Sequence, residues 1–101
     1  MFGDLMGNME EKQKAMREKL EAIEITETLE GVTIKGNGAR EILNISIDEA
    51  YLVGERKEEL EDILLVAMNN LLLKITEAEA KESQNMISQM LPPGMEGLFG
   101  G

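Results

Sequence analysis

The chain has 101 residues, with twenty acidic and ten basic side chains and a formal net charge of −10. A length of this order corresponds to one domain, and 43% apolar residues are enough for a hydrophobic core. His, Cys and Trp are absent. Their absence removes the usual general bases, thiol nucleophiles and soft zinc ligands, so we expect no enzyme, no cofactor and no metal site. The acidic balance also disfavours nucleic-acid binding, except at a locally basic patch.

Residues 1–22 have the spacing of one amphipathic helix. Seven positions at alternating intervals of four and three residues form one stripe: Phe2, Met6, Met9, Gln13, Met16, Leu20 and Ile23. All of them except Gln13 are apolar. So narrow a stripe predicts pairing with one other helix, from the same chain or from a second copy. Between the stripe positions lies the densest basic cluster of the chain, Lys12, Lys14, Arg17 and Lys19.

Residues 23–47 change to the alternation of half-buried strands, with β-branched Thr among the polar positions. Gly31 and the sequence Gly36-Asn37-Gly38 mark two turns. The pattern predicts a three-stranded antiparallel meander over residues 22–29, 31–36 and 40–47. A sheet this small needs a helix or a second sheet against its apolar face.

A second helical pattern covers residues 55–90 and would be about 50 Å long. Between residues 63 and 73 it is apolar nearly all round, which is typical of a helix buried on several sides. One small sheet cannot enclose such a helix, so we expect a homodimer. The residues predicted at its interface are Ile45, Ile63, Leu64, Met68, Leu71 and Leu72.

The sequence lacks the patterns that direct export or membrane insertion. The first residues have neither a basic start nor an apolar run, and the longest apolar stretch is far below the roughly 20 residues of a membrane span. We therefore expect a cytoplasmic protein without a membrane partner. Pro92-Pro93-Gly94 should end the long helix and leave residues 91–101 as a flexible tail.

Five segments carry a family resemblance through their order and separations. They are Met1–Leu20 with Gln13-Lys14-Ala15-Met16, Gly31–Gly38, Ile45–Asp48, Leu60–Leu64 followed by Ala67–Asn70, and Leu91–Met95. Together they resemble the YbaB/EbfC family along essentially the whole of residues 1–101. The resemblance implies an α+β homodimer whose terminal helices project like tweezers. It also implies a single domain that binds double-stranded DNA in the bacterial nucleoid.

Six basic residues are the candidate DNA contacts: Lys12, Lys14, Arg17, Lys19, Lys74 and Lys81. The chain has neither an aromatic series for base stacking nor a base-reading motif, so we expect backbone contacts with low sequence preference. The alternative for the four residues of the first helix is salt bridging along a helix pair. The alternative for the whole chain is an acidic dimeric module that grips a protein partner with its Met-rich helices and tail.

Overall fold

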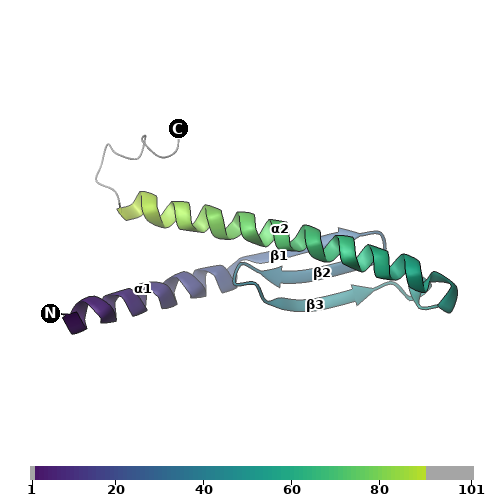
Figure 1. Cartoon of the computed structure of the whole chain (residues 1–101), viewed down its shortest axis with the longest axis horizontal. Coiled ribbons are helices and arrows are strands. Elements are labelled where there is room, and N and C mark those ends of the chain that lie inside the picture. Colours follow the sequence, from purple (N-terminus) through teal and green to yellow (C-terminus); the bar gives the residue numbers. More distant parts are fainter. Residues whose placement is uncertain (1, 91–101) are drawn as a thin grey trace.

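A computed structural model describes the backbone of residues 2–90 and the side chains of residues 8–89. The predicted α+β class is confirmed, with one helix, a three-stranded antiparallel sheet and one long helix in that order (Figure 1). The elements are α1 (Phe2–Ala22), β1 (Glu24–Leu29), β2 (Val32–Asn37), β3 (Ile42–Ile47), the 3₁₀ helices η1 (Glu49–Tyr51) and η2 (Gly54–Arg56), and α2 (Lys57–Met90). The expected tail, residues 91–101, lies outside the described residues.

The sheet is a meander in the order β1-β2-β3, and both of its turns contain a residue with positive φ, Glu30 and Arg40. Paired residues share a face, so the pairing of Ile34 with Ile45 puts both side chains on one side of the sheet. The pairing of Thr28 with Thr33 lies on the other, polar side, where their hydroxyls are 3.1 Å apart. One face of the sheet is therefore apolar, as the alternation predicted.

The core lies between this apolar face and α2, which packs mainly on β1 and β2. Four α2 side chains spaced by four residues form one stripe: Ile63, Ala67, Leu71 and Ile75. They contact a cluster that includes Val32 and Ile34 of β2. Ile63 and Leu71 are thus buried by their own chain. This corrects the expectation that a second subunit covers them, because the small sheet is sufficient for one side of the helix.

The start of α2 is held by the two short 3₁₀ turns, and the helix begins at Lys57, two residues after the predicted start at residue 55. The Asp48 carboxylate accepts a hydrogen bond from the Ala50 amide at 2.9 Å and so caps η1. The Arg56 guanidinium lies 3.9 Å from the centroid of the buried Tyr51 ring.

In the described part of the chain, neither α1 nor the 34-residue α2 is apolar enough over its length to cross a membrane.

Replacing Leu71 with Glu should abolish cooperative thermal unfolding, because Leu71 is 0% exposed and the new carboxylate would be buried without a partner. The matched control is Leu52→Glu, between η1 and η2, where the side chain is also 64% exposed. Circular dichroism melting of both variants checks this. A cooperative transition for Leu71→Glu, or its loss for Leu52→Glu, would contradict the packing described.

Candidate nucleic-acid interface

Two arms extend from the same end of the sheet, α1 and residues 80–90 of α2 (Figure 1). A cleft of about 400 Å³ lies between them. It is lined by Lys12, Gln13 and Met16 from α1 and by Ser83, Met86 and Ile87 from α2. The heptad stripe of α1 therefore faces the far half of α2 in the same chain. The contact is loose, because Met9 and Ile87 remain about half exposed.

The β2–β3 turn lies at the fork, which is the place where the two arms leave the sheet. The Gly38 amide donates to the carbonyl oxygens of Leu20 at 2.9 Å and Ile23 at 3.0 Å, which attaches the turn to the end of α1. A Cβ at residue 38 would lie 2.8 Å from the Leu20 oxygen, so this close approach requires glycine. Asn37 Oδ1 accepts hydrogen bonds from the amides of Ala39 and Glu41 inside the turn.

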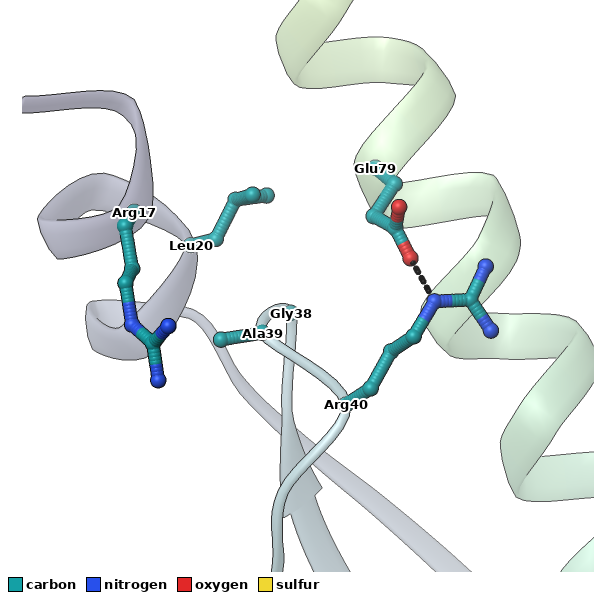
Figure 2. A pocket seen from close by; sticks show the side chains of 6 residues that line it. All are labelled: Arg17, Leu20, Gly38, Ala39, Arg40 and Glu79. Atoms are coloured by element: carbon teal, nitrogen blue, oxygen red, sulfur yellow. Dashed lines mark ion pairs between the residues drawn. The ribbon is translucent and has the colours of Figure 1, made fainter. Parts of the chain in front are cut away.

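Arg40 connects the same turn to the other arm. Its Nε lies 2.5 Å from Oε1 of Glu79 on α2 (Figure 2). Beside this ion pair is a second hollow, of about 270 Å³, lined by Arg17, Leu20, Gly38, Ala39, Arg40 and Glu79. The turn thus contacts α1 through its backbone and α2 through a side chain.

The four basic residues predicted on α1 are all exposed on one arm. Arg17 donates from Nε to Glu21 Oε1 at 2.8 Å, and this hydrogen bond raises the pKa of the guanidinium. Lys12, Lys14 and Lys19 make no ion pair with the side chains of residues 8–89. Lys81 on the α2 arm is likewise exposed and makes no ion pair within that range. Of the four basic residues on α1, Arg17 is therefore the one that forms a salt bridge with a described side chain of its own chain.

Lys74, also predicted as a DNA contact, lies against the body of the protein. Its ammonium group is 2.5 Å from Glu27 Oε1 and donates to the Thr26 carbonyl oxygen at 3.2 Å. Asn70 donates to the other Glu27 oxygen at 2.9 Å. Glu27 is only 8% exposed, and its hydrogen bonds from Lys74 and Asn70 lower the pKa of its carboxyl. The contacts of Lys74 and Asn70 with Glu27 attach α2 to β1. Lys74 is therefore not brought together with the basic residues of the arms.

The negative charge is concentrated at the opposite end of the molecule. Residues 48–62 contain seven acids and two bases, a net charge of −5, around the start of α2. The side chains of residues 8–22 comprise four acids and four bases, and residues 80–89 contain one of each, Lys81 and Glu82. Over residues 8–22 and 80–89 the charges therefore cancel, although the chain is strongly acidic.

Among the described residues, no group of three or more acids is arranged to hold a metal ion.

Sequence reasoning missed two features of this site. It did not single out Arg40, although it predicted the turn at Gly36-Asn37-Gly38 that carries it. It also did not compare the local charge of the predicted arms with that of residues 48–62, where a count would have shown the excess of acids. Both signals were present in the sequence. What the sequence could not supply is the contact between Arg40 and Glu79, which are 39 residues apart along the chain.

Comparisons with known proteins agree with this fold. The profile of the YbaB/EbfC DNA-binding family matches residues 1–90, and the chain belongs to that family. A nucleoid-associated protein of Mycoplasmopsis pulmonis is 38% identical over 88 residues, covering 87% of this chain and 84% of the relative. One from Flavobacterium johnsoniae is 33% identical, covering 94% of each. The crystal structure of the uncharacterized protein HP0035 from Helicobacter pylori matches with a TM-score of 0.71 and 25% identity, covering 85% of this chain and 92% of that one.

The ion pair of Glu27 with Lys74 should make stability depend on pH. Because folding lowers the pKa of Glu27, the pair stabilises the fold above the ordinary Glu value of about 4.5 and is lost as the pH falls through the lower folded value. The melting temperature of the native chain should therefore exceed that of Glu27→Gln at pH 7, and the difference should shrink below pH 4.5.

The matched control is Glu24→Gln. Glu24 pairs with Lys35 at 3.1 Å on the exposed side of the sheet, where an ion pair contributes about 0–1 kcal/mol. Its replacement should change the melting temperature little at either pH. A difference between the native chain and Glu27→Gln that stays constant from pH 7 to pH 3 would contradict the role given to Glu27.

Proposed function

We propose that this protein is a non-enzymatic, nucleoid-associated protein of the bacterial cytoplasm that binds double-stranded DNA as a homodimer. Binding is mainly to the phosphate backbone and has low sequence preference. Membership of a family described as DNA-binding supports this proposal, as do relatives named nucleoid-associated proteins. The observation that carries it is the separation of the acidic end from arms whose lysines make no ion pair with the side chains of residues 8–89.

That separation answers the objection from net charge. Asp62 and Lys81 are 19 residues apart on one helix, which corresponds to about 28 Å. Charges interact weakly in solution beyond about 8 Å at physiological salt. A phosphate group at the arms would therefore encounter mainly the local charges, and the excess acids at the start of α2 would have little effect on its binding.

The side chains offered by the arms favour backbone contacts. Lysine ammonium groups bind phosphates as point charges and carry no information about base sequence. The chain has only three aromatic residues, and Tyr51 is buried beneath Arg56 in the body. Base stacking is consequently a poor alternative to charge attraction here. Lys12, Lys14, Arg17, Lys19 and Lys81 remain the proposed contacts, whereas Lys74 belongs to the support of α2.

The homodimer is proposed from a second apolar face of α2. Leu65, Val66, Leu72 and Leu73 lie on the side of the helix away from the core stripe, and all four are exposed in the single chain. At the edge of the sheet, Ile42 and Ile45 are exposed beyond the cover of α2. Exposed apolar surface of this extent is typical of an interface. A stable dimer would bury more than about 2,000 Å² in total.

The proposed interface keeps most of the residues expected from the sequence. Ile45 and Leu72 are exposed, and Leu64 and Met68 are half-buried at the margin of the core. A second copy would cover these four together with Leu65 and Leu73. It would also double the basic residues of the arms, which gives each DNA duplex two sets of contacts.

A protein-interaction module is the second candidate function. The observation in its favour is the cleft between the arms, where Met16, Met86 and Ile87 present an apolar surface. Methionine side chains adapt readily to different partners. In this alternative the arms would grip an apolar segment of another protein, and the lysines would contribute solubility alone.

DNA binding should show the salt dependence of phosphate contacts. If about four of the eight basic residues on the paired α1 helices contact phosphate, log K should fall with log salt at a slope near −3.6, a loss of roughly 10² between 50 and 200 mM. Changing Lys12 and Lys19 to Ala should weaken binding equally for unrelated duplexes and make the slope shallower. Fluorescence anisotropy with two unrelated duplexes measures both effects.

The control for charge is Lys57→Ala, which removes a basic residue at the acidic end and should leave the slope unchanged. Undetectable binding of the native chain at 50 mM salt would favour the protein-interaction module instead. A marked preference for one duplex would contradict backbone recognition.

The dimer should separate into monomers when Leu72 is replaced by Glu, because the new charge would face the partner's apolar surface. Sedimentation equilibrium at micromolar concentration should show a dimer for the native chain and a monomer for Leu72→Glu. Thr28→Glu, on the polar face of the sheet, should remain dimeric. A native chain that sediments as a folded monomer would contradict the proposed assembly.

A further inference from the structure

We propose that Arg40, at the fork between the arms, is a phosphate-contacting residue of the DNA interface, and that Glu79 competes with the phosphate for it. The inference rests on the proposed function and adds a residue from the sheet to an interface otherwise made by the two helical arms. It starts from the hollow of about 270 Å³ that has Arg17 on one wall and Arg40 on another (Figure 2).

The backbone of Arg40 is held in place by the turn around it. Asn37 Oδ1 accepts from the amides of Ala39 at 3.0 Å and Glu41 at 3.2 Å, and the Arg40 amide donates to the Asn37 carbonyl oxygen at 3.2 Å. Gly38 is fixed against the end of α1. The guanidinium is thus presented from a rigid support, which reduces the entropy lost when it binds an anion.

The conformation of Arg40 is unusual for its residue type. Its φ is 65°, in the left-handed region that glycine adopts without strain and that other residues rarely adopt. Glycine already occupies positions 36 and 38 of this hairpin. A residue held in such a conformation is most readily explained by what its side chain does.

The contact with Glu79 leaves most of the Arg40 guanidinium available. Figure 2 shows the carboxylate meeting Nε, with the two terminal nitrogens on the far side of the group. The Arg40 side chain is 55% exposed, and Glu79 is its one carboxylate partner among residues 8–89. Oε1 of Glu79 is buried and accepts no hydrogen bond of good geometry in spite of the short distance. A phosphate could form two parallel hydrogen bonds with these terminal nitrogens, a stronger arrangement, and it would then face the negative charge of Glu79 across the same guanidinium.

The alternative is that the pair of Arg40 and Glu79 is only a brace that sets the spacing of the arms. The two explanations predict opposite effects of removing Glu79. If the pair is a brace, loss of either partner should weaken DNA binding. If Glu79 competes with phosphate, loss of its charge should strengthen binding, and only while Arg40 is present.

The first test is Arg40→Gly, which removes the guanidinium and suits the positive φ. Its melting temperature should stay within a few degrees of the native value, because the Arg40 side chain is 55% exposed and the backbone strain is relieved. DNA binding at 50 mM salt should weaken by about fivefold or more. The salt slope should become shallower by about 0.9 for each Arg40 that contacts phosphate.

The second test compares Glu79→Gln with Glu77→Gln, which removes the same charge from the opposite side of the same helix. Glu79→Gln should tighten binding severalfold more than Glu77→Gln does, because Glu79 alone of the two contacts Arg40. In an Arg40→Gly background, Glu79→Gln should have no more effect than Glu77→Gln.

Three results would overturn the inference. If the native chain binds and Arg40→Gly binds equally well with the same slope, Arg40 makes no phosphate contact while the proposed function stands. If Glu79→Gln weakens binding as Arg40→Gly does, the pair is a brace. Absence of binding by the native chain would overturn the proposed function and this inference together.

Discussion

The packing of one stripe of α2 on the sheet determines the rest of the structure. Ile63, Ala67, Leu71 and Ile75 are buried against β1 and β2, and this burial fixes both the position and the rotation of the helix. Because α2 is 34 residues long and the strands have six residues each, the helix must extend past the sheet. The same rotation turns Leu65, Val66, Leu72 and Leu73 toward solvent. The α2 arm and the proposed dimer surface are both consequences of that contact.

The fold could be predicted from the sequence because each element has its own period. The four-and-three spacing of α1, the alternation around Ile34 and the turn at Gly36-Asn37-Gly38 are local signals, and the structure agrees with them. The division of the apolar run 63–73 was not predictable from the helix alone. A helix that is apolar all round does not reveal which face meets its own sheet, so Ile63 and Leu71 were assigned to the partner although they belong to the core.

The candidate site was predicted only where a residue acts by itself. Lys12, Lys14 and Lys19 lie exposed on an arm, as their positions between the apolar stripe of α1 indicated. Lys74 differs because its partner, Glu27, is on another element, and Arg40 was missed because its contact is with Glu79 on α2. Contacts between distant parts of the chain decide whether a charge supports the fold or is available to a ligand, and the sequence does not contain them explicitly.

The central claim is that separation of charge along the molecule lets an acidic protein bind DNA through arms whose charges cancel over residues 8–22 and 80–89. It is tested most directly by neutralising two acids at either end and measuring DNA affinity at 150 mM salt. Glu58→Gln with Glu61→Gln at the start of α2 should change the dissociation constant by less than about twofold, because those charges are screened. Glu10→Gln with Glu18→Gln on α1 should tighten binding severalfold. Equal effects of the two pairs would contradict the account, since net charge and not its placement would then govern binding.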